Sequence, residues 1–221
     1  MGREYLGGED MSNKNISMAV IRRLPKYHRY LGDLLDRDIQ RISSKELSEI
    51  IGFTASQIRQ DLNNFGGFGQ QGYGYNVEEL YNEIGNILGL SRKYNTIIVG
   101  AGNLGQAIAN YSGFSKAGFK IKALFDANPR MIGLKIRDFE ILDSEKIEEF
   151  IENNEIDIAI LCIPKNGAQE LVDRIVKSGI KGIWNFAPLD LEVPNDVIVE
   201  NVNLTESLFT LSYLMKEQED E

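Results

Sequence analysis

One stretch of this 221-residue chain decides its fold: Thr96-Ile97-Ile98-Val99-Gly100-Ala101-Gly102-Asn103-Leu104-Gly105. The first four residues predict a buried strand, and the three spaced glycines predict a tight turn into a helix. Each glycine has a task at such a turn: Gly100 makes the turn, Gly102 admits a pyrophosphate to the backbone, and Gly105 lets the helix pack on the strand. We therefore expect the six residues from Gly100 to Gly105 to bind a dinucleotide. The alternative is a tight strand–helix turn without a ligand.

A carboxylate follows these glycines at the spacing that dinucleotide sites use. Asp126 stands at the end of the next predicted strand, 21 residues after Gly105. Such a carboxylate accepts hydrogen bonds from the ribose hydroxyls of an adenosine and would repel a 2′-phosphate. The expected cofactor is therefore NAD(H) rather than NADP(H).

Predicted strands and helices alternate over residues 91–203. Strands are expected at 96–99, 119–125, 156–163, 182–186 and 197–202, and helices at 104–111, 145–153 and 168–177. Strands that are apolar on both faces, separated by amphipathic helices, predict an α/β fold with a doubly wound parallel sheet, a Rossmann domain. Four residues lie at the carboxyl ends of two predicted strands, where open α/β sheets bind ligands: Cys162, Pro164, Phe186 and Pro188. They either end the strands or line a pocket, and the sequence favours neither alternative.

Residues 16–90 carry a different pattern, which predicts a helix-turn-helix. Two short amphipathic helices each open with a capping-box pair, Ser43 with Glu46 and Thr54 with Gln57, and only Gly52 and its neighbour separate them. Such a pair of helices can place its second helix in the major groove of DNA. A longer helix precedes them, over residues 16–35.

Glycine and aromatic residues alternate after the two short helices, over residues 65–75. Glycines break helices and aromatic residues favour strands, so this segment predicts a β-hairpin, the wing of a winged helix. A helix over residues 77–88 then leads to the second domain. In the first helix, Pro25 either produces a kink or begins a second part.

Side chains suited to DNA lie on the second short helix. Arginine reads guanine, asparagine and glutamine read adenine, and serine takes a phosphate or a base edge. The alternative is an ordinary solvated helix face. With additions from the first short helix and the wing, the residues expected at DNA are Ser44, Ser56, Gln57, Arg59, Gln60, Asn63, Asn64, Phe68, Gln70 and Tyr73.

The formal charge of −9 is unevenly distributed. Residues 11–77 hold nine Lys or Arg against six Asp or Glu, so this part could approach phosphates. No apolar run reaches the roughly 18 residues of a membrane span, and the N-terminus lacks the order of a secretion signal. We expect a soluble cytoplasmic protein whose residues 1–15 are a flexible leader, with Met11 as an alternative start.

The sequence disfavours an enzyme and a metal site. A hydride-transferring enzyme needs a proton donor or acceptor near the cofactor, and the only histidine, His28, lies in the DNA-binding part. The only cysteine, Cys162, lies in an apolar run and is expected to be a buried small hydrophobe; a reactive thiol is the alternative. Redox sensing then has to come from a ligand.

From about Ile16 to Met215 the chain resembles the Rex family of redox-sensing transcriptional repressors. The motifs that carry the resemblance are Ser43-Ser44-Lys45-Glu46-Leu47, Gln57-Ile58-Arg59 with Asp61-Leu62, the wing at 65–75, the loop at 100–105, the segment 111–114 and Asn185-Phe186-Ala187-Pro188. The resemblance implies a repressor that binds double-stranded operator DNA. NADH would release the operator, while NAD⁺ competes for the same site and permits DNA binding.

The resemblance also implies a homodimer in which the C-terminal segment, residues 204–221, is exchanged between protomers. Its helix would pack between the partner's two domains. Tyr111 matches a tyrosine near the nicotinamide, and Arg29 matches an arginine whose ion pair changes between states. Asn203 stands where the family often has Asp, and Gln60 where it commonly has Lys.

Two other classes of protein remain open at this stage. One is an NAD-dependent oxidoreductase with an N-terminal extension. The other is a nucleotide-binding regulatory subunit whose helix-turn-helix-like part contacts proteins.

Overall fold

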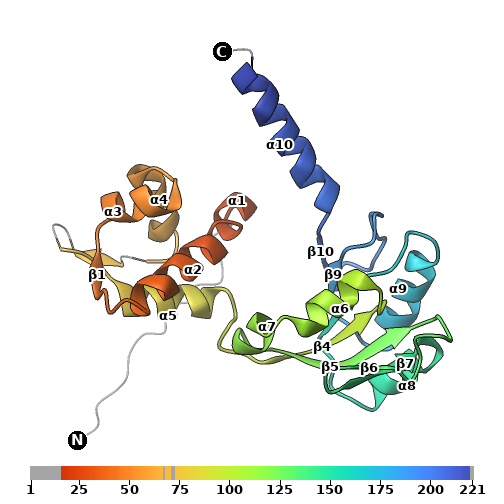
Figure 1. The fold of residues 1–221 in the computed structure, drawn as a ribbon. Helices are drawn as coiled ribbons and strands as arrows, with labels where there is room; N and C mark the ends of the chain where they lie inside the picture. Colours follow the sequence, from red (N-terminus) through yellow and green to blue (C-terminus); the bar gives the residue numbers. More distant parts are fainter. Residues whose placement is uncertain (1–15, 67, 71–72, 220–221) are drawn as a thin grey trace, which may run out of the picture. The chain divides into compact units, whose positions relative to one another are not determined.

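The computed structural model describes residues 16–219 apart from residues 67, 71 and 72, and it divides into two units, residues 1–91 and 92–221 (Figure 1). Each unit has its own buried apolar core. The expected leader, residues 1–15, lies outside the described residues.

The first unit combines short helices with a small antiparallel sheet of strand order β1-β3-β2. Pro25 lies in the first turn of its second helix, where proline costs no helical hydrogen bond, so it begins that helix. The elements are α1 (Met18–Ile21), α2 (Leu24–Leu35), β1 (Arg41–Ile42), α3 (Ser44–Ile51), α4 (Ala55–Asn63), β2 (Gly69–Gln70), β3 (Gly74–Asn76) and α5 (Val77–Ile87).

Caps and a left-handed glycine define the two short helices α3 and α4. Ser43 and Glu46 form the predicted capping box at the start of α3, and Gly52 ends this helix with a φ of 80°. The Thr54 hydroxyl accepts a hydrogen bond from the backbone N–H of Gln57, as predicted for α4. The reciprocal half of this second box was predicted wrongly, because the Gln57 side chain binds Asp61 instead.

The second unit contains a seven-stranded sheet of order β10-β9-β8-β4-β5-β7-β6, in which only the edge strand β6 is antiparallel to its neighbour. The six parallel strands have the 3-2-1-4-5-6 order of a Rossmann domain. The strands are β4 (Tyr94–Val99), β5 (Phe119–Asp126), β6 (Lys135–Ile136), β7 (Phe139–Asp143), β8 (Ile158–Leu161), β9 (Gly182–Asn185) and β10 (Ile198–Asn201).

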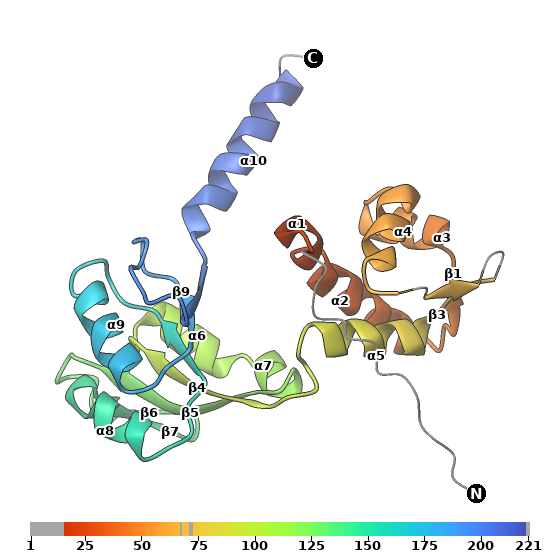
Figure 2. The same ribbon diagram turned by 180° about the vertical axis from the view of Figure 1, so that it is seen from behind.

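Helices cover both faces of this sheet, as Figures 1 and 2 show. Side chains of α8 and α9 pack on one face and side chains of α6 and α7 on the other. The helices are α6 (Asn103–Asn110), α7 (Gly113–Lys116), the 3₁₀ turn η1 (Ser144–Lys146), α8 (Ile147–Glu152) and α9 (Ala168–Lys177).

Some elements of the second unit were not predicted. Strand β7 does not alternate regularly between buried and exposed residues, because Ile141 is buried while Phe139 and Leu142 are only partly buried. Strand β6 is only two residues long. Helix α7 is four residues long and lacks an amphipathic repeat. Among the described residues, no helix is both long and apolar enough to cross a bilayer.

The last helix, α10 (Leu204–Glu219), differs from every other long helix in its exposure. In both views it extends away from the sheet of its unit (Figures 1 and 2). Every one of its residues is exposed, including the large apolar side chains Leu204, Leu208, Phe209, Leu211, Tyr213, Leu214 and Met215.

Candidate functional site

The glycine loop between β4 and α6 has the geometry that the sequence predicts. Gly100 has a φ of 97°, and a Cβ placed on it would lie 2.3 Å from the carbonyl oxygen of Cys162. A Cβ on Gly105 would lie 1.9 Å from the carbonyl oxygen of Gly100. A Cβ on Gly102 meets no atom within 4 Å among the described residues. The protein itself therefore requires the first and third glycines, whereas the space at the second is left open.

Helix α6 begins directly beside this open space. Gly102 is its N-cap residue and makes no side-chain capping bond. Free N–H groups and the positive end of the helix dipole attract phosphate at such a position. The observation that a Cβ would project from Gly102 into open space fits a pyrophosphate that approaches the backbone there.

Asp126 lies at the carboxyl end of β5, next to the loop. One carboxylate oxygen accepts a hydrogen bond of 2.7 Å from the backbone N–H of Ala101, and the other accepts one of 2.7 Å from Asn128. These bonds hold the carboxylate at the carboxyl-end edge of the sheet, near the pair β4 and β8, at which the strand order reverses. Rossmann domains bind nucleotides at this position.

A cavity of about 570 Å³ opens at this edge. It brings together five of the residues predicted for the cofactor: Gly100, Gly102, Asp126, Cys162 and Pro164. The other loop residues stand around it, with Ala101 and Gly105 buried, Leu104 packed against the core and Asn103 exposed at the start of α6.

Cys162 is a half-buried wall residue of this cavity. Burial raises the pKa of its thiol to about 12. A neutral thiol is a poor nucleophile, so the geometry favours the predicted role as a small apolar residue.

Arg174, which the sequence analysis missed, also lines this cavity and forms an ion pair. Arg174 on α9 donates two hydrogen bonds to Glu148 on α8, at 2.9 and 2.8 Å. The bonds from Arg174 lower the pKa of Glu148, and the same pair raises the pKa of Arg174. Two of the guanidinium nitrogens bind Glu148 and the third lies 3.6 Å from Glu145, so carboxylates of the protein already compensate its charge. The residues lie 26 positions apart, which leaves no local sequence signal.

The aromatic residues predicted near the nicotinamide belong to a chain of rings beyond the cavity. Tyr111 contacts Phe114, Phe114 contacts Trp184, and Trp184 contacts Phe186, with ring centroids 4.9, 5.5 and 4.6 Å apart. Tyr111 is 61% exposed. Pro188 lies elsewhere, in a small hollow of about 70 Å³ beside Asn203.

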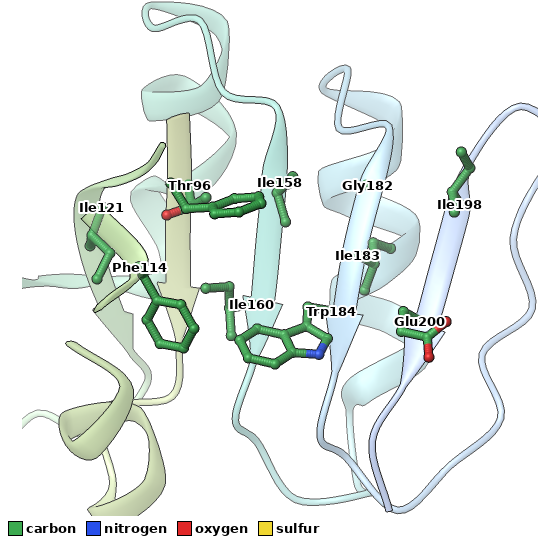
Figure 3. Close-up of a pocket in the computed structure, with 11 residues that line it drawn as sticks. Thr96, Phe114, Ile121, Ile158, Ile160, Gly182, Ile183, Trp184, Ile198 and Glu200 are labelled. Carbon is green, nitrogen blue, oxygen red and sulfur yellow. The ribbon is translucent and has the colours of Figure 1, made fainter. Parts of the chain in front are cut away.

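A second, apolar hollow of about 410 Å³ lies on the sheet face that carries α6 and α7. Figure 3 shows Phe114 from α7, Ile160 from β8 and Trp184 from β9 close together on this face. The Thr96 hydroxyl is buried there and has no hydrogen-bond partner in the described part of the chain. We call this hollow the sheet groove.

The predicted DNA-binding residues separate into two groups on the first unit. Exposed positions on α4 and the wing are Ser56, Arg59, Gln60, Asn63 and, 72% exposed, Tyr73. Arg59 donates a hydrogen bond of 2.8 Å to the hydroxyl of Ser44 on α3, so the two helices present one polar surface.

Three of the remaining predicted DNA-binding residues make contacts within the unit. The Asn64 amide binds the carbonyl oxygens of Gln60 and Asp61 at the end of α4. Phe68 packs against the core of the unit. Gln57 is half-buried against Asp61, and the Gln70 side chain lies outside the described part of the structure.

The residues of the predicted switch lie in different units. Arg29 on α2 stacks over the ring of Tyr30, 4.8 Å from its centroid. Asn203 accepts a hydrogen bond from the backbone N–H of Thr205 and donates one to Glu206. The asparagine therefore caps α10, a role that an aspartate would also fill.

Two families match the chain: one described as CoA binding domain, over residues 91–189, and one described as putative DNA-binding protein N-terminus, over residues 15–63. A curated relative, the redox-sensing transcriptional repressor Rex of Clostridioides difficile (strain 630), is 84% identical over 94% of this chain and 99% of its own length. The chain belongs to the Rex family. The Rex repressor of Caldanaerobacter subterraneus subsp. tengcongensis is 71% identical over 95% of this chain and 94% of its own length. Both Rex-family relatives are named as transcriptional repressors, not as enzymes.

Two crystal structures of RSP, a Rex-family repressor, are also similar to this Rex-family chain. The complex of RSP with β-NAD⁺ and operator DNA has a TM-score of 0.88 and 68% identity, and covers 94% of this chain and 95% of that one. The complex with β-NADH has a TM-score of 0.86 and 64% identity, and covers 94% and 97%. The predicted fold class, a DNA-binding domain followed by a Rossmann domain, is confirmed.

Proposed function

We propose that this protein is a DNA-binding transcriptional repressor that senses NADH against NAD⁺. The observation that carries the proposal is the similarity to RSP over 94% of the chain, in one structure with NAD⁺ and operator DNA and in another with NADH. Such a repressor acts where the DNA and the NAD pool of a bacterium are, in the cytoplasm.

The second unit would hold the cofactor. Gly102 and the N-terminus of α6 receive the pyrophosphate, and Asp126 accepts hydrogen bonds from the adenosine ribose. NADPH and coenzyme A carry a phosphate on this ribose, so Asp126 repels both. The paired Arg174 offers that phosphate no compensating charge.

The other end of the cofactor would determine the response. NADH differs from NAD⁺ by a hydride that removes the positive charge of the nicotinamide ring. Apolar surroundings disfavour an unpaired charge, and the predicted nicotinamide residues Tyr111, Pro164 and Phe186 offer apolar surfaces. The neutral ring is therefore bound more tightly in the state that releases DNA.

The first unit would bind the operator, with α4 in the major groove and the wing beside it. Arg59 and Gln60 lie on the exposed face of α4, and Ser44 and Ser56 supply hydroxyls for phosphates. Because a dimer reads two half-sites about one helical turn apart, a modest rotation between protomers is enough to lose one of them.

The dimer would form through α10, exchanged between protomers. Apolar residues occupy several sides of this exposed helix, so it has to be covered by more than one surface. The sheet groove, lined by Phe114 and Trp184, is an apolar face of the second unit that the partner's helix can cover.

A single titration tests the proposal. The protein is bound to a duplex that it selects from a random pool in the presence of NAD⁺, and NADH, NAD⁺, NADPH or coenzyme A is then added at one fixed salt concentration. We expect NADH alone to release the duplex. Binding that is indifferent to NADH and NAD⁺ contradicts the sensor, and loss of NADH absorbance with small carbonyl substrates would favour the oxidoreductase.

A further inference from the structure

Asp61 is a wholly buried carboxylate on helix α4, whose opposite face is exposed. Arg23 donates to its two oxygens at 2.6 and 2.7 Å, the Tyr27 hydroxyl donates at 2.6 Å, and the amide nitrogen of Gln57 donates at 2.7 Å. A carboxylate offers about four acceptor sites, so these bonds use its full capacity. The site tolerates only hydrogen-bond donors.

This requirement determines which end of the Gln57 amide, the nitrogen or the oxygen, faces Asp61. An ionised carboxylate only accepts hydrogen bonds, so the nitrogen of the amide, not the oxygen, must face Asp61. Burial raises the pKa of Asp61, but the hydrogen bonds from Arg23, Tyr27 and Gln57 outweigh this effect and lower the pKa, which keeps the group ionised.

The remaining edge of the Gln57 amide has a defined chemistry. One N–H is bound to Asp61, which leaves the oxygen as an acceptor and the second N–H as a donor. This is the pair that binds the N6 amino group and N7 of adenine in the major groove. The opposite orientation would turn both N–H donors outward, toward the acceptors of guanine.

Gln57 also has the position that base reading requires. It lies in the first turn of α4, and N-terminal residues of a recognition helix contact base edges. Its neighbours Ser56 and Gln60 are exposed. Its side chain does not complete the capping box, although its backbone N–H is bound by Thr54.

We infer that Asp61 is a positioning residue of the DNA interface, which orients the Gln57 amide to read adenine at one operator position. The inference rests on the proposed operator binding. If Asp61 served only to tie α4 to Arg23 and Tyr27, its replacement would weaken binding to every sequence equally.

The test uses the full chain with NAD⁺ and the duplex selected by the native protein, together with a set of duplexes in which each base pair is changed in turn. The native protein should lose roughly 5- to 100-fold in affinity when one adenine is changed to guanine. Gln57→Met should abolish that preference and leave the preferences at other positions intact. It keeps the bonds from Arg23 and Tyr27 to Asp61 and removes only the bond from Gln57.

The variant Asp61→Asn provides the second arm. An asparagine amide can face Gln57 with its own N–H₂, which turns the Gln57 oxygen inward, so the preference for adenine over guanine should fall at the same position. The double variant should show no further loss. Leu34→Ala, which removes a buried side chain of α2, is the control for lowered stability and should keep every base preference.

Each result decides between the alternatives. A native base preference that survives in Gln57→Met overturns the inference but not the operator binding. An equal loss at all positions in Asp61→Asn, matched by Leu34→Ala, assigns Asp61 a purely structural role. If Asp61→Asn does not fold, Gln57→Met still decides whether Gln57 reads adenine, and the role of Asp61 fails if it does not. Absence of any selected duplex overturns both this inference and the proposed function.

Discussion

Gly102 and Gly105 are two residues of one motif that serve different physical ends. Gly105 has no room for a side chain, because a Cβ would overlap the carbonyl of Gly100. Gly102 has an ordinary φ of −70° and open space around it. The fold therefore requires a glycine at position 105, and we propose that the ligand requires the one at position 102.

The variants Gly102→Ala and Gly105→Ala should distinguish the role in ligand binding from the role in folding. We expect Gly102→Ala to keep the native unfolding free energy to within about 0.5 kcal/mol but to weaken NADH binding at least roughly tenfold, because its methyl group occupies the pyrophosphate space. Gly105→Ala should lower the unfolding free energy by about 1–3 kcal/mol through overpacking. Denaturant titration measures the unfolding free energy, and calorimetric titration measures the affinity for NADH. Equal effects of the two variants on stability would contradict this division.

Cys162 provides a second prediction at this scale. With a pKa of about 12, only a very small fraction of the thiol is ionised at pH 8, and this fraction increases as the pH is raised toward the pKa. Iodoacetamide should therefore modify the native protein far more slowly than the denatured chain. Cys162→Ser should leave release by NADH intact. Modification at the rate of a free cysteine would identify a reactive thiol instead.

Among the elements, α10 is the one whose own unit gives it no cover. Its seven large apolar residues are each 52–67% exposed. Most helices of this length bury one stripe, whereas a helix that is apolar on several sides is stable only inside an assembly. This element therefore carries information about the oligomer.

Changing Leu211 and Leu214 to Glu should convert the proposed dimer to a monomer. Two buried charges without partners oppose burial of the helix by several kcal/mol, so dissociation should be complete at micromolar concentration. Sedimentation equilibrium measures the mass, and Gln218→Glu near the end of the helix is the matched control for added charge. A doubly substituted protein that stays dimeric would place the interface elsewhere.

For the whole molecule, the proposed switch is a coupling between two binding sites. Coupling free energies are reciprocal: if NADH lowers the affinity for operator DNA by some factor, the operator lowers the affinity for NADH by the same factor. We expect a factor of about 5 to 150, measured as the NADH dissociation constant with and without the selected duplex. An NADH affinity that the duplex leaves unchanged would mean that the two sites are not linked.

The sequence by itself determined the parts of this protein that depend on consecutive residues. The glycine loop, the cap of α3 at Ser43, the turn at Gly52 and the spacing to Asp126 follow from the backbone preferences of a few neighbouring residues. The motifs of the Rex family could be recognised in the sequence because they too consist of neighbouring residues. A charge at position 61 on the apolar face of α4 was a usable signal that a buried partner exists.

Only the tertiary structure decided which side chains meet across long stretches of chain. Arg23 reaches Asp61 over 38 positions and Arg174 reaches Glu148 over 26, and the sequence contains no local preference for either contact. The direction of the Gln57 amide follows from the first of these pairs, because a carboxylate surrounded by donors accepts only the nitrogen end. Local chemistry set the elements, and packing set the orientation of side chains such as the Gln57 amide.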